Sequence, residues 1–201
     1  MTSGRPQRFI LASQSPRRRE LLKRAGYTFE VIPSAVDEST FDETLDPETY
    51  VKTLALAKAE EVADRFPDRL VMGADTVVDC NGEIIGKPRN RTDAEAITRR
   101  VFAQAHRVVT GLALICRIKN LVVVEVDVTV VYPKPMTEAG IAAHLAGGSW
   151  EGKAGAYAIQ ETGDQFVERV DGSLSNVIGL PMELLGQLLR EQVGQIPQPP
   201  L

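Results

Sequence analysis

Two long strand-like segments in the middle of the chain constrain its fold more than any other feature. Residues 106–116 and 121–132 flank a polar turn, which predicts a long β-hairpin. In the second segment, valines alternate with polar residues between Val124 and Val130. We therefore expect this strand to have one buried face and one solvated face. The polar residues on the second face are Glu125, Asp127 and Thr129.

Helix and strand signals alternate on both sides of this hairpin, which is typical of an α/β domain with a mixed, twisted sheet and flanking helices. Shorter strands are expected at residues 9–12, 29–32, 70–74, 76–78, 83–85, 157–160 and 165–170. Helices are expected to begin near Pro16, Pro47, Thr92, Thr137 and Pro181. We predict one domain over residues 9–193, an N-terminal extension at 1–8 and a flexible tail at 194–201.

Charge and hydropathy limit the classes of partner. The chain has 23 Lys and Arg against 27 Asp and Glu, a net charge of −4, which argues against general binding to nucleic acid or an anionic membrane. No apolar run approaches the roughly 20 residues of a membrane span, and no signal peptide is apparent, so we expect a cytoplasmic protein. Cys80 and Cys116 lack metal-site spacing and are expected to stay thiols in a reducing compartment. His106 and His144 lack the spacing of a triad or zinc site and are expected to be structural.

Three arginines follow the first expected strand at the start of a helix. Ser15 is a suitable helix cap, and Pro16 suits the first helical position. The arginines at 17–19 oppose the helix dipole, so this turn predicts a site for an anion such as phosphate. The alternative is a solvated basic face with salt bridges to nearby acids.

Two charged residues lie where apolar neighbours are expected. Lys58 is on the apolar stripe of its helix, where it either reaches water past the core or enters a cleft to bind phosphate. Asp75 follows the strand at 70–74, and strand ends carry reactive groups in α/β folds. Alternatively, its carboxylate accepts hydrogen bonds from a turn. Thr76 adds a hydroxyl beside it, and Lys87 follows a glycine at a strand exit, where it could also be simply solvated.

Carboxylate and amide side chains elsewhere suggest a cation site and a group that reads a nucleobase. Asp37 and Glu38 form a carboxylate pair that could share a hard cation with Asp75. The alternative is a solvated acidic loop, because further acids follow up to Asp46. Gln160 ends an apolar run, where its amide could read a base edge through one donor and one acceptor.

Seven short motifs occur in one order between about residues 9 and 190. They are Leu-Ala-Ser-x-Ser-Pro-Arg-Arg-x-Glu-Leu-Leu, Asp-Glu, Tyr-Val-x-x-Leu-Ala-x-x-Lys-Ala, Gly-Ala-Asp-Thr-Val-Val, Gly-Lys-Pro, Gly-Ala-Tyr-Ala-Ile-Gln and Val-Ile-Gly-Leu-Pro. Together they resemble the Maf family, the septum-formation-inhibitor-like nucleotide pyrophosphatases. The resemblance implies a single-domain Maf-type α/β fold with a central cleft, related to that of inosine triphosphate pyrophosphatases.

The resemblance also implies hydrolysis of a nucleoside triphosphate to the monophosphate and pyrophosphate, in the branch that acts on dTTP and UTP. By position it makes Asp75 the general base and, with Glu38, the ligand of a divalent metal, Mg or Mn. The implied phosphate-binding residues are Ser13, Ser15, Arg18, Lys58 and Lys87. The implied substrate-specificity residues are Arg17, Thr76 and Gln160. The motif leaves the position of Arg19 open, so this residue is expected at the surface.

The sequence departs from the family pattern in three places. Gln14 and Glu161 stand where glycines are common, and residues 101–106 replace the usual Leu-Ser-Gly stretch. Glu161 follows the residue implied to read the base, so it adds a negative charge there. The departures therefore bear on the nucleotide preference more than on the reaction. The alternatives are hydrolysis of 7-methyl-GTP or another modified nucleotide, or a nucleotide-sensing regulator of cell division without essential catalysis. The central hairpin also offers an edge for a homodimer.

Overall fold

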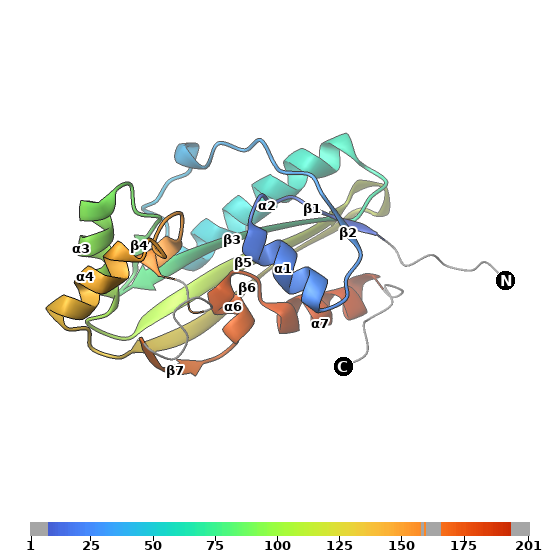
Figure 1. The fold of residues 1–201 in the computed structure, drawn as a ribbon. Helices are drawn as coiled ribbons and strands as arrows, with labels where there is room; N and C mark the ends of the chain where they lie inside the picture. The colour runs from blue at the N-terminus through green and yellow to red at the C-terminus, as the bar shows by residue number, and fades with distance from the viewer. Residues whose placement is uncertain (1–7, 158, 160–165, 194–201) are drawn as a thin grey trace.

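A mixed sheet runs through the molecule in the strand order β2-β1-β3-β5-β6-β7, with β4 paired to β3 (Figure 1). This computed structural model describes residues 8–157, 159 and 166–193. The strands are β1 (Phe9–Leu11), β2 (Phe29–Val31), β3 (Val71–Cys80), β4 (Glu83–Ile85), β5 (His106–Cys116), β6 (Leu121–Pro133) and β7 (Val167–Asp171). β1 pairs in parallel with β2 and β3, and the other pairs are antiparallel. The predicted mixed α/β sheet and its long central hairpin are confirmed.

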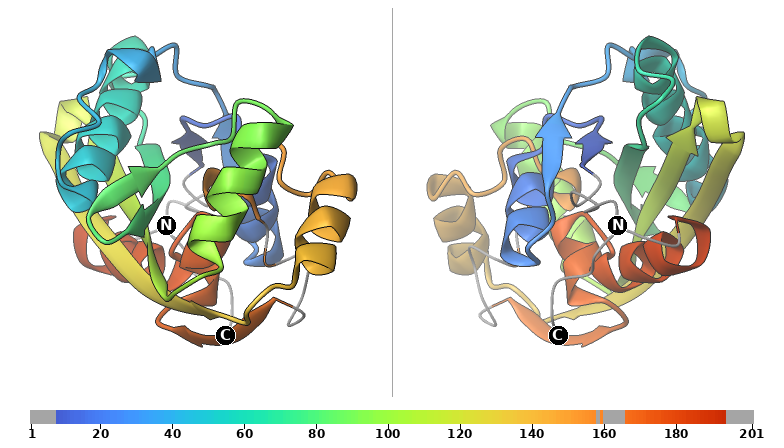
Figure 2. Two further views of the ribbon diagram at one scale, coloured as in Figure 1. Left: turned by 90° about the vertical axis from the view of Figure 1, so that its left-hand side faces the viewer. Right: turned by 90° about the vertical axis from the view of Figure 1, so that its right-hand side faces the viewer.

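Helices cover both faces of this sheet. They are α1 (Pro16–Arg24), α2 (Pro47–Arg65), α3 (Arg91–Val101), α4 (Glu138–Ala146), α6 (Leu174–Ile178) and α7 (Met182–Val193), with 3₁₀ helices η1 (Glu38–Thr40), η2 (Arg117–Lys119) and η3 (Ala154–Ala156). Figures 1 and 2 show α2 along one face, and α1, α6 and α7 against the opposite face. Each face has its own apolar core, one around α2 and one that includes α1 and α7. None of the described helices is both long enough and apolar enough to cross a membrane.

Two glycines let α2 lie directly on the sheet. A Cβ atom at Gly73 of β3 would be 2.3 Å from the backbone oxygen of Ala55, and one at Gly111 of β5 would be 2.3 Å from that of Val51. No side chain fits at such distances, so the helix packs against bare backbone. This close approach brings Lys58 of α2 to the middle of β3.

Capping and turn residues begin and end several elements as the sequence predicts. Ser15 caps α1 by accepting a hydrogen bond from the amide of the third helical residue, with Pro16 in the first position. Asp46 caps α2 in the same way. The turn between β3 and β4 has positive φ at both Asn81 and Gly82, as a tight hairpin turn requires.

The strands expected at 70–74 and 76–78 are one continuous strand, β3. Asp75 therefore lies in the middle of a strand, not at a strand end as predicted. A carboxylate is tolerated there because its charge is compensated by the ammonium of Lys58, which reaches it from α2. The apolar pattern of the sequence is interrupted at Asp75, but the hydrogen-bonding ladder with β5 is not.

Three other local predictions are wrong. The side chain that caps α3 is Asn90, two residues before the expected Thr92, because its carbonyl oxygen can accept from a backbone amide in the first turn. Tyr157, where a strand was expected to begin, comes directly after the 3₁₀ helix η3 and is in no strand, and residues 158 and 160 of the expected strand lie outside the described residues. The second face of β6 is not solvated throughout, because α6 covers Thr129, whose hydroxyl receives a 3.0 Å hydrogen bond from Asn176.

The outer edge of β6 is only partly paired. β7 pairs with β6 from Val130 to Pro133, and no other described strand lies along the remaining part of that edge. A strand with unpaired backbone groups can take up a further strand. The homodimer expected at this hairpin stays a prediction.

Candidate active site

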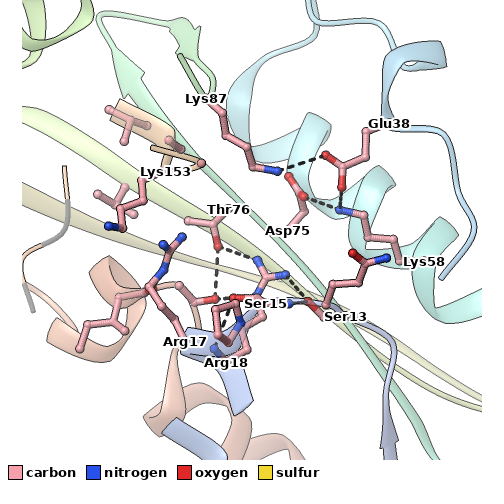
Figure 3. Close-up of a pocket in the computed structure, with 18 of the residues that line it drawn as sticks. Ser13, Ser15, Arg17, Arg18, Glu38, Lys58, Asp75, Thr76, Lys87 and Lys153 are labelled. Carbon is pink, nitrogen blue, oxygen red and sulfur yellow. Dashed lines mark hydrogen bonds and ion pairs between the residues drawn. The ribbon is translucent and has the colours of Figure 1, made fainter. Parts of the chain in front are cut away.

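A cavity of about 810 Å³ lies where the first turn of α1, the middle of β3 and the core face of α2 come together. Its lining also includes the loop at 34–38, residues 151–154 and the end of α6. Figure 3 shows that charged side chains from these elements point toward one another. Gln160 lies outside the described residues. The other nine predicted site residues all line this cavity: Ser13, Ser15, Arg17, Arg18, Glu38, Lys58, Asp75, Thr76 and Lys87.

Arg18 is buried at the base of the cavity, with 8% of its surface exposed. Its guanidinium donates four hydrogen bonds within the protein. Their acceptors are Gly179 O (2.8 Å), Ala74 O (2.8 Å), Ser13 Oγ (3.1 Å) and Thr76 Oγ1 (3.0 Å). Burial lowers the pKa of the Arg18 guanidinium, and the charge of Asp75 opposes this shift. One of its five N–H groups is left for a phosphate, so most of its bonding capacity connects α1, β3 and the residues after α6.

The other two arginines of this turn differ from Arg18 in their surroundings. Arg17 is half-buried in the cavity wall, and its Nε donates a 3.2 Å hydrogen bond to the carbonyl of Ile178. Arg19 is exposed and does not line the cavity, as the sequence predicts. The basic turn is therefore divided into one internal anchor, one wall residue and one surface residue.

Lys58 lies between two carboxylates. Its Nζ is 2.6 Å from Asp75 Oδ1 and 2.7 Å from Glu38 Oε1. The second oxygen of Glu38 is 3.8 Å from Nζ of Lys87. The side chains of Lys58 and Asp75 are 9% and 12% exposed, whereas that of Glu38 is 47% exposed. Lys58 therefore does not reach water past the core, and its ammonium enters the cavity.

Charge around Glu38 favours its ionised form. Burial alone would raise the pKa of the Glu38 carboxyl, but the hydrogen bond and charge of Lys58, together with Lys87 and Arg18, bring the pKa below its ordinary value. Two carboxylates that converge on one ammonium offer oxygen ligands for a hard divalent cation. No group of three or more His, Cys, Asp or Glu with metal-site geometry occurs among the described residues. The pair therefore fits a metal that takes its remaining ligands from water and phosphate oxygens.

Small hydroxyl side chains hold the backbone of the cavity in place. Ser13 Oγ accepts hydrogen bonds from Ser15 N (3.2 Å) and from Arg18. Thr76 Oγ1 contacts Arg18, Gly179 O (3.3 Å) and Thr110 Oγ1 (3.0 Å). These hydroxyls shape the loop before α1 and the wall after α6.

Part of the cavity lining is apolar, a feature that the sequence analysis did not predict. The apolar residues are Val78, Val108, Tyr157, Ile159 and Val177, and the charged residues Glu151 and Lys153 line the cavity as well. The five apolar residues pack together in one cluster. Alternation along β3 could have placed Val78 on the same face as Thr76, two residues earlier. The cavity thus combines charged groups with an apolar surface suited to a flat, weakly polar group.

Both histidines are structural, as predicted. His106 is buried, with Nδ1 3.1 Å from Val101 O and Nε2 2.9 Å from the hydroxyl of Tyr157. Burial lowers the pKa of His106. A neutral ring that donates to Val101 O and accepts from Tyr157 fits both contacts. His144 is buried beneath residues 154–156 and lies 2.8 Å from Ala156 O.

The family model described as "Maf-like protein" matches residues 8–192. The chain belongs to the Maf family. Curated Maf relatives include the dTTP/UTP pyrophosphatase of Elusimicrobium minutum, 44% identical over 184 residues that cover 92% of this chain and 98% of that protein. The dTTP/UTP pyrophosphatase of Gloeobacter violaceus is 47% identical over 184 residues, with 92% and 95% covered. Among solved structures, the Staphylococcus aureus Ham1 protein has a TM-score of 0.52 at 15% identity, covers 92% of this chain and 98% of its own, and shares the fold.

The Maf motifs thus converge in three dimensions. The motif at 11–22 supplies the anchor and wall arginines, the motif at 50–59 supplies Lys58, and the motif at 73–78 supplies Asp75 and Thr76. Asp37 of the Asp-Glu motif caps η1 with its carboxylate, and Glu38 is the one that meets Lys58. The individual roles of these side chains stay predictions.

Proposed function

We propose that this Maf-family chain hydrolyses dTTP and UTP to the nucleoside monophosphate and pyrophosphate. The observation that carries the proposal is a single cavity whose lining combines arginines, lysines and carboxylates with a cluster of apolar side chains. Such a cavity fits a nucleoside triphosphate lying lengthwise, with its phosphates among the charges and its base between the valines. Relatives named dTTP/UTP pyrophosphatase, 44% and 47% identical over nearly the whole chain, support the choice of nucleotide.

The reaction breaks the anhydride between the α and β phosphates. A water oxygen bonds to phosphorus, the bridging oxygen leaves with pyrophosphate, and the water proton passes to a base. Asp75 is our choice for this base, because its carboxylate lines the cavity beside the ammonium of Lys58. Negative charge that develops on pyrophosphate is stabilised by Lys58, Lys87 and the remaining N–H group of Arg18.

We propose a divalent metal, Mg or Mn, as the cofactor, with Glu38 and Asp75 as its protein ligands. When bound, it would neutralise charge on the phosphate oxygens. Because Lys58 joins the same two carboxylates in this structure, it is placed to move from them to a phosphate oxygen. Ser13, Ser15 and Arg18 keep the surrounding loop in the shape that receives the phosphates.

Selection of the pyrimidine is assigned to Arg17, Thr76 and Gln160. Arg17 and Thr76 line the cavity beside the wall at 177–179, whose carbonyls they contact. We place the activity in the cytoplasm, where a pool of triphosphates is available, and treat a role in septum formation as separable from hydrolysis.

Pyrophosphate release from a panel of canonical and modified triphosphates with Mg²⁺ tests the proposal. We expect turnover of dTTP and UTP, and a loss of about 10²- to 10⁴-fold in kcat for Asp75→Asn. Asp42→Asn is the matched control, because it makes the same side-chain change at an exposed carboxylate that does not line the cavity. Preference for 7-methyl-GTP, or equal rates for Asp75→Asn and wild type, would refute it. A division phenotype that survives Asp75→Asn would identify a regulatory role independent of catalysis.

A further inference from the structure

A second threonine lies directly behind the cavity residue Thr76. Thr76 of β3 is paired with Thr110 of β5 in the register of the sheet, and their hydroxyl oxygens are 3.0 Å apart. Thr110 is completely buried and does not line the cavity. A buried hydroxyl in a strand of mostly apolar residues needs a hydrogen-bond partner.

The direction of the hydrogen bond follows from the available partners. Among the residues that the structure describes, the hydroxyl of Thr110 has one partner, Thr76. A buried hydroxyl whose proton has no acceptor is destabilising, so Thr110 donates to Thr76. Thr76 also accepts a 3.0 Å hydrogen bond from Arg18 Nη2, which occupies its second lone pair. Its own proton is then directed to the carbonyl of Gly179, 3.3 Å away.

The hydroxyl of Thr76 is thereby saturated, with two bonds accepted and one donated. It has no lone pair or proton left for a nucleotide. What it does is hold the carbonyl of Gly179, which Arg18 Nε also binds at 2.8 Å. The preceding carbonyl, Ile178 O, is held by Arg17. Residues 177–179 form one wall of the cavity, so these contacts fix the position of that wall.

We propose that Thr110 is a positioning residue for nucleotide selection, which acts through Thr76 on the wall at 177–179. The inference rests on the proposed pyrimidine nucleotide function. When the wall at 177–179 is held at a fixed distance from the opposite side of the cavity, a pyrimidine fits between the apolar side chains and the larger purine is excluded by its size. Without the hydroxyl of Thr110, Thr76 loses one of its three hydrogen bonds, the wall is held less firmly and purines are excluded less well.

The test is Thr110→Val, which has nearly the same shape as threonine and lacks the hydroxyl. Affinities for dTTP and dGTP are measured by titration calorimetry in the absence of metal, and kcat/KM for both is measured with Mg²⁺. We expect the preference for dTTP over dGTP to fall about three- to tenfold, the value of one ordinary hydrogen bond. Thr110→Ser keeps the hydroxyl and is expected to retain the preference. Thr110→Ala is a second variant without the hydroxyl, should valine prevent folding.

Thr98→Val is the matched control. Thr98 is also completely buried and lies in α3, away from the cavity lining, and its hydroxyl has no hydrogen-bond partner among the described residues. This substitution is expected to leave the nucleotide preference unchanged. An unchanged dTTP preference in both Thr110→Val and Thr110→Ala would overturn the inference, as would an equal loss in Thr98→Val or a wild type that binds dTTP and dGTP alike. If the binding preference shifts as expected but the wild type releases no pyrophosphate, the inference stands and the proposed function fails.

Discussion

Gly73→Ala is expected to impair the active site from a position outside the cavity. The added Cβ would lie 2.3 Å from Ala55 O and 2.8 Å from Ala59 N, both backbone atoms of α2 that cannot rotate away. The helix must therefore move by roughly 0.7 Å to reach even 3.0 Å, the shortest distance that real Cβ contacts show. That shift would draw Lys58 away from Asp75, whose contact is now 2.6 Å. We expect kcat to fall about 10- to 100-fold and unfolding to become easier by about 1–3 kcal/mol.

Gly86→Ala is the matched control, because a Cβ at Gly86 would have nothing within 4 Å and its backbone is not in the left-handed region. It should leave both quantities unchanged. The assays are steady-state pyrophosphate release and urea unfolding for the two variants and the wild type. A Gly73→Ala protein with wild-type kcat, or one whose loss of activity is matched by Gly86→Ala, would refute the argument that α2 must contact bare backbone to position Lys58.

Two further predictions concern the charges around Lys58. Lys58→Met leaves two carboxylates without their shared cation, and we expect the free energy of unfolding to fall by about 2–3 kcal/mol. This loss is smaller than the roughly 3–5 kcal/mol typical of breaking a fully buried pair, because Glu38 is 47% exposed. Addition of Mg²⁺ should restore part of the lost stability. Lys87→Met, whose lysine is 61% exposed and 3.8 Å from Glu38, should lose far less, and equal losses in urea unfolding would contradict this account. The folded-state pKa of Glu38 lies below its ordinary value, so its contribution is complete above about pH 4.5 and is lost as the pH falls through the lower folded pKa. Glu38→Gln should flatten the dependence of the free energy of unfolding on pH in that acidic window, and an unaltered dependence as the pH falls below about 4.5 would exclude the linkage.

The sequence predicts the elements whose ends carry local signals. Ser15 with Pro16 and the Asn81-Gly82 turn depend on neighbouring residues alone, and both are found where expected. The continuation of β3 through Asp75 could not be predicted from neighbouring residues. The charge that compensates the buried carboxylate of Asp75 is that of Lys58, which comes from α2.

The sequence predicted which residues line the site better than it predicted their contacts. Nine predicted residues line one cavity, since the motifs that carry them are short and distinctive. Arg18, however, was expected at the phosphates, and it is chiefly bonded to carbonyls 56 and 161 positions further along the chain. Such partners are set by the tertiary fold and leave no pattern in the sequence around an arginine.

The bonds from Arg17 and Arg18 to Ile178 and Gly179 also bear on when the protein becomes active during its synthesis. The wall that these carbonyls belong to is made almost last, after β1, β3 and β5 have all been translated. Until that segment is translated, the guanidinium of Arg18 lacks one of its four acceptors and the cavity lacks one side. A nascent or prematurely terminated chain can therefore assemble most of its sheet yet not a closed nucleotide cavity, so that only finished molecules draw on the cell's supply of triphosphates.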